Sequence, residues 1–290
     1  MVGYYTLRNR NNVIRRPVCL VRQLPVQEKE PMSTAIQIDN ITKKFGYLTA
    51  LDGVSFSVPE NTIYGVLGPN GAGKTTLFSI IAGFFASDAG KVTVLGEEDR
   101  GRLRGRMSIL PQNALFQANI PIIDQLTYFL RLLGRSKARA ESEVLDVLKL
   151  VELDDVMHRE TATLSHGMYK RLALAQAFLG EPEVIILDEP TSGLDIKTAK
   201  QIRDLIKKLK SSATVIVSSH NMDEMRELCE SVAFLNMGKL VAAGPVDMVT
   251  GTSRTIDCIL GRPLEEPEKS AIAAMEGIKT VESAGEGKYS

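Results

Sequence analysis

The order of apolar and polar residues separates two kinds of candidate strand. Residues 35–39 and 54–58 alternate apolar with polar side chains, which is typical of antiparallel strands with one exposed face. Residues 63–67, 184–187 and 215–217 are continuous apolar runs, as in strands that helices cover on both faces. Further candidate strands are residues 91–95 and 107–110. The pattern predicts an α/β fold whose mixed sheet has an antiparallel edge.

Helical spacing dominates the stretch between residues 120 and 162. Val144, Leu148 and Val151 fall on one helical face, and the acidic start at 141–143 predicts that a helix begins there. We interpret this stretch as a helical insert in the α/β fold. A later amphipathic helix, expected to pack on the sheet, is predicted from apolar residues at i, i+3, i+4 and i+7, which are Ile202, Leu205, Ile206 and Leu209.

Charge and composition limit the possible classes of function. Among 290 residues, 35 are Lys or Arg and 35 are Asp or Glu, so no overall field attracts nucleic acid or an anionic membrane. No apolar run approaches the roughly 18 residues of a membrane span, so the chain is not expected to cross a membrane by itself. Three cysteines and three histidines form no ligand cluster, which favours a reducing compartment and argues against structural zinc.

A glycine-rich loop follows the first continuous apolar run. Residues 63–76 read I-Y-G-V-L-G-P-N-G-A-G-K-T-T, a strand that runs directly into G-x-x-x-x-G-K-T. Glycines let the backbone N–H groups of such a loop turn inward toward a phosphate. Lys74 supplies a point charge for the β- and γ-phosphates, Thr75 offers a hydroxyl to Mg²⁺, and a helix opening near Lys74 adds its positive end. The complete pattern predicts a nucleotide site rather than a glycine-rich turn that only resembles one.

A second chemical signal is the acidic pair that ends the apolar run at 184–187. If this strand lies parallel to the strand before the glycine-rich loop, Asp188 can hold Mg²⁺ through water. Glu189 would then face the γ-phosphate and polarise an attacking water. Such a pair is common by itself, and the upstream glycine-rich loop makes the interpretation specific.

Between residues 35 and 244 the sequence resembles the ATP-binding cassette (ABC) ATPases, the nucleotide-hydrolysing subunits of ABC transporters. Six motifs stand in the order that this family requires: Walker A at 68–76, the Q-loop residue Gln112, the signature at 164–168, Walker B at 184–189, the D-loop at 192–195 and the switch residue His220. Phe45, which lies 29 residues before Lys74, matches the aromatic residue that stacks on adenine in the family; a core phenylalanine is the alternative.

The resemblance implies a P-loop NTPase of the ABC nucleotide-binding type, with ATP and Mg²⁺ as cofactors. The implied catalytic residues are Lys74, Glu189 and His220. The implied nucleotide-binding residues are Phe45, Gly68, Pro69, Asn70, Gly71, Ala72, Gly73, Lys74, Thr75, Thr76, Gln112, Ser165, Gly167 and Asp195. The implied Mg²⁺ ligands are Thr75, Gln112 and Asp188. Gln112 lies where the insert joins the sheet, so it can report the γ-phosphate to the insert.

The signature departs from the family's commonest L-S-G-G-Q, because His166 replaces Gly and Met168 replaces Gln. Ser165 and Gly167 remain, and the resemblance implies that they reach a γ-phosphate across a dimer interface. Substitutions of this kind resemble the exporter-type branch, whose membrane subunits are separate chains. The β-carbon of His166 restricts backbone conformations that a glycine would allow. The substitution therefore affects the expected geometry of the dimer contact.

The resemblance further implies a subunit that dimerises with itself or a homologous cassette, binds an integral membrane permease made by a separate chain, and binds no nucleic acid. Its expected location is cytoplasmic, peripheral at the inner face of the cell membrane. One alternative is a soluble ABC ATPase that acts on DNA or ribosomes, although Lys74 and Ser165 are only 91 residues apart and leave no room for a long coiled coil. Another is a nucleotide-sensing module, against which Glu189 and His220 argue. The transported substrate belongs to the membrane subunit.

Three segments are expected along the chain, with the cassette at residues 32–244. Residues 1–31 carry six basic and two acidic residues, and we expect this basic N-terminal extension to be disordered. A tail for a membrane surface or partner, an organelle-type leader, and an extension ahead of a start at Met32 are the alternatives, of which we favour the last. Residues 245–290 form a small C-terminal accessory segment, with candidate strands at 255–260 and 278–281 and a candidate helix at 268–275.

Overall fold

The computed structural model describes residues 33–250 and five short strands outside that range. Antiparallel pairs join β1 (Leu7–Asn9) to β2 (Asn12–Ile14), and β14 (Lys288–Tyr289) to both β12 (Cys258–Ile259) and β13 (Ser283–Gly285). The β1–β2 pair was not predicted, because no strand period is legible there. The candidate helix at 268–275 and strand at 278–281 lie outside the described residues, and the three-segment division of the chain stays a prediction.

A six-stranded mixed sheet is the centre of the cassette, in the order β11-β10-β5-β9-β8-β7. Its strands are β5 (Ile63–Leu67), β7 (Met107–Leu110), β8 (Val184–Asp188), β9 (Thr214–Ser219), β10 (Ser231–Asn236) and β11 (Lys239–Pro245). The pairs from β10 to β7 are parallel, and only β11 runs antiparallel to its neighbour in this sheet. The candidate strand at 107–110 is therefore β7, a parallel strand. The sequence pattern did not predict β10 and β11.

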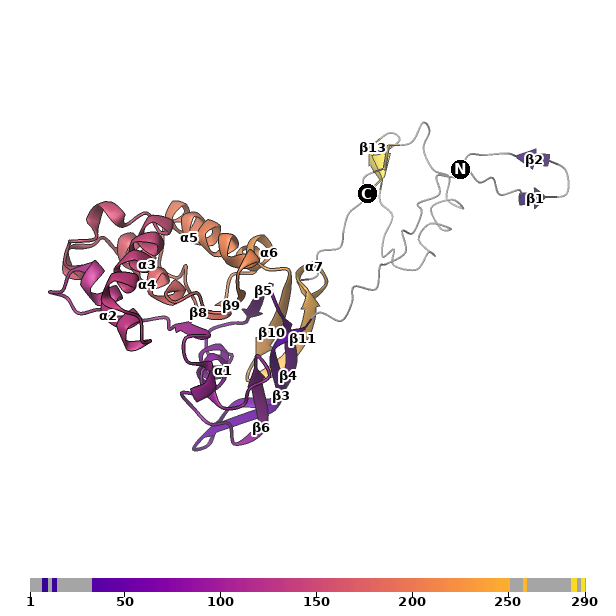
Figure 1. The fold of residues 1–290 in the computed structure, drawn as a ribbon. Coiled ribbons are helices and arrows are strands. Elements are labelled where there is room, and N and C mark those ends of the chain that lie inside the picture. Colours follow the sequence, from indigo (N-terminus) through magenta and orange to yellow (C-terminus); the bar gives the residue numbers. More distant parts are fainter. Residues whose placement is uncertain are drawn as a thin grey trace. The chain divides into compact units, whose positions relative to one another are not determined.

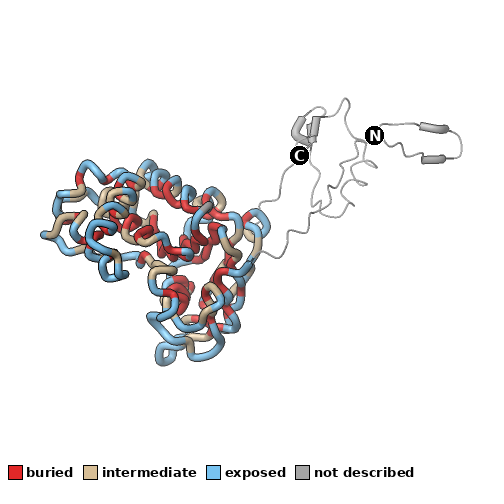
Figure 2. The backbone as a smooth tube through the Cα atoms, viewed as in Figure 1, coloured by how far each residue is buried: buried red, intermediate tan, exposed pale blue. Residues whose placement is uncertain are grey.

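The central strands are mainly apolar because they serve two cores. In β8, Ile185 and Leu187 pack in the core with the larger set of helices, whereas Val184 and Ile186 pack in the core with the antiparallel sheet. Successive side chains of a strand point to opposite faces, so one strand supplies both cores in alternation. Figure 2 shows the resulting concentration of buried residues along the middle of the cassette. Each fully buried aliphatic side chain contributes about 1.5–3 kcal/mol.

An antiparallel sheet of three strands packs with α1 (Lys74–Ile81) against one face of the larger sheet. Its order is β4-β3-β6, from β3 (Thr34–Phe45), β4 (Leu48–Pro59) and β6 (Ala89–Val94). The alternating residues of β3 and β4 bury one face and expose the other. Figure 1 shows this sheet and α1 on the side of the cassette opposite α5 and α6. The predicted antiparallel edge is confirmed.

The predicted helical insert is also confirmed. It contains α2 (Ile122–Leu132) and α3 (Lys137–Leu150), and α4 (His166–Phe178) follows it. The predicted start of a helix at 141–143 was wrong, because Ser136 caps α3 and its Oγ accepts a hydrogen bond from the Arg139 N–H. An N-cap serine satisfies a helix amide directly, whereas acidic residues near the start act only through the dipole.

The remaining helices cover the larger sheet or connect its strands. They are η1 (Arg100–Leu103), η2 (Asp154–Val156), η3 (Thr161–Thr163), α5 (Ile196–Lys208), η4 (Leu209–Ser211), α6 (Met222–Leu228) and α7 (Val246–Val249). The four apolar positions predicted for the later amphipathic helix are all buried, so α5 packs on the sheet as expected. The fold as a whole is the predicted α/β class.

Two glycines provide a matched test of the antiparallel sheet. Gly90 and Gly96 have φ angles of +79° and +78°, but a Cβ on Gly90 would lie 2.3 Å from the Asn40 carbonyl oxygen, whereas a Cβ on Gly96 meets nothing within 4 Å. Gly96→Ala should therefore cost about 1–2 kcal/mol from backbone strain alone. Gly90→Ala should cost about 1–3 kcal/mol more because of overpacking. Urea unfolding measures both; equal losses would show that β6 shifts freely away from β3.

Candidate functional site

Three parallel strands bring the predicted motifs to one edge of the sheet. Leu67 at the end of β5 pairs with Ser219 on β9, and Asp188 at the end of β8 pairs with Ser218. The glycine-rich loop, the acidic pair and His220 follow these strand ends directly. Carboxyl ends of parallel strands are where α/β sheets bind ligands. Register in the sheet thus gathers residues that lie more than a hundred positions apart in sequence.

The glycine-rich loop needs glycine for two physical reasons. Gly73 is the N-cap of α1 at φ +102°, and a Cβ there would lie 2.6 Å from the Ala50 carbonyl oxygen. At Gly68 a Cβ would lie 2.4 Å from the Leu235 carbonyl oxygen. Because Gly73 brings no capping side chain, the first-turn amides of α1 are available to an anion, which the positive end of the helix also attracts.

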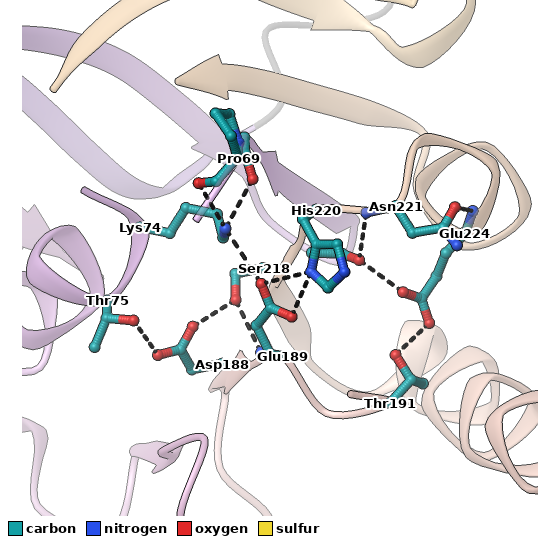
Figure 3. Close-up of polar contacts among 12 residues, drawn as sticks. Pro69, Lys74, Thr75, Asp188, Glu189, Thr191, Ser218, His220, Asn221 and Glu224 are labelled. Atoms are coloured by element: carbon teal, nitrogen blue, oxygen red, sulfur yellow. Dashed lines mark hydrogen bonds and ion pairs between the residues drawn. The ribbon is translucent and has the colours of Figure 1, made fainter. Parts of the chain in front are cut away.

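Lys74 is buried at the first position of α1, and its ammonium points back across the loop. Its Nζ donates to the carbonyl oxygens of Gly68 at 2.8 Å and Pro69 at 3.2 Å, and lies 3.2 Å from Oε1 of Glu189 (Figure 3). An ammonium has three N–H donors, and these three oxygens match them. The side chain is therefore held in place at the point where a phosphate would contact the loop.

Hydroxyl groups fix the acid at the end of β8. Oδ2 of Asp188 accepts a hydrogen bond from Thr75 Oγ1 at 2.7 Å, and Oδ1 accepts one from Ser218 Oγ. Ser218 Oγ also accepts from the Glu189 N–H at 2.9 Å. Thr75 and Asp188 together present hard oxygen donors beside the loop, which fits the ligand preference of Mg²⁺. Ser218 was missed in the sequence, although it is the first serine of the S-S-H motif.

Glu189 turns out of the strand with a left-handed backbone, φ +49°. Its carboxylate then lies between Lys74 and His220, whose Nδ1 is 2.8 Å from Oε2 and 3.1 Å from Oε1. An ionised carboxylate only accepts hydrogen bonds, so Nδ1 is the protonated nitrogen in this contact. The Glu189 side chain is 8% exposed and His220 is 51% exposed. The buried acid is thus oriented by a cation on one side and an imidazole on the other.

One cavity of about 640 Å³ collects most of the predicted residues. The predicted residues that line it are Phe45, Asn70, Gly71, Ala72, Gly73, Lys74, Thr75, Thr76, Gln112 and Glu189. Phe45 is 45% exposed and meets Phe85 edge to face at 5.7 Å, so it is not a core residue. The volume lies within the range of small-molecule and cofactor sites.

The same cavity has a wall that the sequence did not indicate. It includes Leu48, Thr49 and Ala50 from β4 and the β10–β11 turn at Met237 and Gly238. The turn is held there by main-chain hydrogen bonds, from the Asp52 N–H to the Gly238 oxygen at 2.8 Å and from the Gly238 N–H to the Ala72 oxygen at 3.1 Å. Since these contacts join segments distant in sequence, no local motif marks them.

Five predicted nucleotide-binding residues do not line this cavity: Gly68 and Pro69 of the loop itself, and Ser165, Gly167 and Asp195. Ser165 is the N-cap of α4, and its Oγ accepts from the Met168 N–H at 3.3 Å. Asp195 is the N-cap of α5, and hydrogen bonds from Thr198 hold the pKa of its carboxyl below the usual range. A Cβ on Gly167 would lie 3.1 Å from Thr198. The starts of α4 and α5 are therefore neighbours on a surface separate from the cavity wall.

Two absences hold for the part of the chain that the structure describes. No group of three or more His, Cys, Asp or Glu side chains is arranged there to hold a metal ion. No helix among those residues combines the length and the apolar character that a membrane span requires.

Known proteins are similar to this chain in both sequence and fold. A family model described as "ABC transporter" matches residues 51–192. The daunorubicin resistance ATP-binding protein DrrA3 of Streptomyces coeruleorubidus is 35% identical over 254 residues, covering 84% of this chain and 79% of that protein. The spermidine/putrescine import ATP-binding protein PotA of Mesorhizobium japonicum is 34% identical over 226 residues, covering 74% and 61%.

Among solved structures, the ATP-binding cassette MJ0796, described as a dimer in a post-hydrolysis state bound to ADP and Pi, superposes with a TM-score of 0.66. It is 25% identical, and the match covers 73% of this chain and 98% of that one. Motif order, cassette fold and relatives agree: the chain belongs to the ABC transporter family, among its ATP-binding proteins.

Proposed function

We propose that this chain binds ATP with Mg²⁺ and hydrolyses it within a head-to-tail dimer of cassettes, and that each cycle drives a conformational change in a separate membrane permease. The observation that carries the proposal is the placement of the Glu189 carboxylate. It borders the cavity between Lys74 Nζ and His220 Nδ1, where the last phosphate of a nucleotide held by the loop would lie.

The phosphates are proposed to bind to the glycine-rich loop. The buried ammonium of Lys74 and the first-turn amides of α1 supply positive charge at the loop. A phosphate oxygen beside Lys74 competes with Glu189 for the same ammonium, so binding loosens that contact. A bound Mg²⁺ would add positive charge beside the phosphates, held by Thr75, Gln112 and Asp188. At the other end of the cavity the exposed face of Phe45 is available to stack on adenine.

In hydrolysis, Glu189 is proposed to orient and partly deprotonate the attacking water. Once Lys74 turns to the phosphate, the freed carboxylate oxygen can accept a proton from a water in line with the leaving ADP. The Nδ1 contact of His220 keeps the carboxylate aimed at this position. The low exposure of Glu189 strengthens the effect, because few other waters compete for it.

The dimer is proposed because three of the predicted nucleotide-binding residues outside the glycine-rich loop do not line the cavity of their own chain. Ser165, Gly167 and Asp195 lie away from the cavity wall, at the positive ends of α4 and α5. The positive end of a helix attracts phosphate, so the hydroxyl of Ser165 and the backbone of Gly167 suit the nucleotide of a second cassette, either the same chain or a homologue, with Asp195 beside them. The MJ0796 structure, described as a dimer, supports a pairing of two cassettes.

A membrane permease is the proposed partner, with the helical insert as the contact surface. The insert and the segment before it expose large apolar side chains, namely Leu115, Tyr128 and Leu132. This arrangement would put the cassette on the cytoplasmic side, peripheral to the membrane. We propose export rather than import, because His166 and Met168 in the signature resemble the exporter-type branch of the family.

Copurification separates the transporter from a soluble ATPase or a nucleotide sensor. We expect an integral protein with several spans to accompany the chain from gently solubilised membranes. Recovery of ribosomes or nucleic acid instead would favour the soluble ATPase, for which the balanced charge of the chain offers no attraction.

The signature can be tested apart from the chain's own nucleotide. Ser165→Arg should abolish turnover while leaving the ATP affinity of the monomer nearly unchanged, because Ser165 is proposed to act on the nucleotide of the partner. His166→Gly serves as the matched neighbour and should have a mild effect. The decisive comparison is nucleotide affinity against steady-state hydrolysis in one preparation. If Ser165→Arg lost both together, the signature would not be working across an interface.

Glu189→Gln tests the proposed general base. The amide keeps the shape but cannot take a proton, so hydrolysis should fall by roughly 10²- to 10⁴-fold. Binding should survive, and loss of a negative charge beside the γ-phosphate should trap an ATP-bound dimer. Phosphate release and size-exclusion chromatography with and without ATP measure both effects.

The matched control for that experiment is Glu230→Gln, at an exposed acid paired with Lys210 at 3.1 Å. It should behave as the unmodified chain in both assays. Near-normal phosphate release from Glu189→Gln would remove Glu189 from the catalytic role and leave the acidic pair as a metal site alone.

A further inference from the structure

Glu224 is a largely buried carboxylate that the nucleotide motifs do not explain. It lies in the first turn of α6, and its side chain is 10% exposed. One oxygen, Oε1, accepts a hydrogen bond from Thr191 Oγ1, and the other, Oε2, accepts one from Ser219 Oγ at 2.7 Å (Figure 3). The Arg203 guanidinium is 3.7 Å from Oε1. The carboxylate thus bridges two hydroxyls from different loops.

Both hydroxyls belong to residues that flank the proposed catalytic pair. Thr191 follows Glu189 by two positions across Pro190, and Ser219 immediately precedes His220. Since Glu189 and His220 contact each other at 2.8 Å, the contacts close a ring. The ring passes from Glu189 along the chain to Thr191, through the Glu224 carboxylate to Ser219, and along the chain to His220. Glu224 therefore lies opposite the contact between Glu189 and His220.

The helix that carries Glu224 is itself anchored to the same ring. Asn221 caps α6, its Oδ1 accepting from the Asp223 and Glu224 N–H groups at 3.0 and 3.2 Å. The Asn221 N–H donates to Ser219 Oγ at 3.0 Å. The Glu224 backbone is therefore fixed to the segment that bears His220, so its carboxylate sets where Thr191 can lie.

We propose that Glu224 is a positioning residue for ATP hydrolysis, holding the two chain segments at the separation in which His220 orients Glu189. The inference rests on the proposed function for the roles of those two residues. It adds a link to the D-loop, because Thr191 leads into residues 192–195 and Arg203 lies on α5, which Asp195 caps. A D-loop displaced by a second cassette would move Thr191 and with it the orientation of the acid.

Burial energetics favour positioning over stability as the reason for this carboxylate. Taking a carboxylate out of water is costly, and a well-packed apolar residue often stabilises such a position as well or better. Glu227, one turn later on α6, provides the contrast. Its side chain is 39% exposed, and it pairs with Arg203 at 2.8 Å and Lys207 at 3.1 Å. Glu227 shares α6 and the contact with Arg203 with Glu224. In the part of the chain that the structure describes, it makes no hydrogen bond to Thr191 or Ser219.

The test measures Mg²⁺-ATPase kinetics and ATP affinity in the full chain. Glu224→Ala should lower kcat by roughly 10- to 100-fold, the usual effect of a misplacement near 1 Å. KM and the ATP dissociation constant should stay within about twofold, because Glu224 does not contact the glycine-rich loop. Glu224→Gln should recover part of kcat, since its amide can still bond both hydroxyls. Glu227→Ala should keep kcat within about twofold, because Glu227 is more exposed than Glu224 and does not bridge Thr191 and Ser219.

A double-substitution cycle addresses coupling directly. Thr191→Val removes one side of the bridge at nearly constant volume and should lower kcat with unchanged ATP affinity. Combined with Glu224→Ala it should cause little further loss, because the two residues act through one contact. Thermal melts accompany every variant, and Thr191→Val decides the question if Glu224→Ala does not fold.

Three results would overturn the inference: normal kcat in Glu224→Ala or Thr191→Val, an equal loss in Glu227→Ala, or ATP affinity falling in step with kcat. Glu189→Gln in the same assay separates this failure from failure of the proposed function. If Glu189→Gln is slow while Glu224→Ala is normal, only the positioning role is wrong. If Glu189→Gln is normal, the catalytic assignment itself is wrong.

Discussion

The register of β5, β8 and β9 is the constraint on which the site depends. Each of these strands sends alternate side chains into two different cores, so a slip of one residue would exchange every apolar contact between the two faces. The register is therefore fixed by packing far from the ligand. Because the strands are held in step, the glycine-rich loop, the acidic pair and the switch histidine leave the sheet side by side.

Much of this could be read from the sequence where the signal was local. A few neighbouring residues are enough to recognise the apolar runs at β5, β8 and β9, the helical spacing in α5 and the glycines before Lys74. The features missed depend on residues that meet only in the folded chain. Glu224 and Thr191 are 33 positions apart, and no local sequence pattern indicates that they are in contact. Similarly, Gly238 reaches the cavity only because β10 and β11 bring their turn against β4.

Neutral hydroxyls donate hydrogen bonds to two of the acids, although Glu224 also has the Arg203 guanidinium at 3.7 Å. Asp188 is bound by Thr75 and Ser218, and Glu224 by Thr191 and Ser219. A hydroxyl donor fixes the position of a carboxylate without cancelling its charge, so Asp188 keeps its negative charge for a metal ion. Glu189 is the exception, since Lys74 lies beside it at 3.2 Å. That pairing is the one a phosphate can exchange, which makes Glu189 the acid whose surroundings respond to the ligand.

The cavity takes its walls from parts of the fold that are built independently. Phe45 and Ala50 belong to the antiparallel sheet, Lys74 to the phosphate-binding helix, Gln112 to the segment that enters the insert, and Glu189 to the end of β8. A ligand that fills it would connect these parts, and its length would decide which of them it contacts. In the binding mode proposed above, a triphosphate would contact all of these parts at once, and loss of the last phosphate would remove the contacts with Gln112 and Glu189. The length of the ligand, more than its identity, would then be what the insert detects.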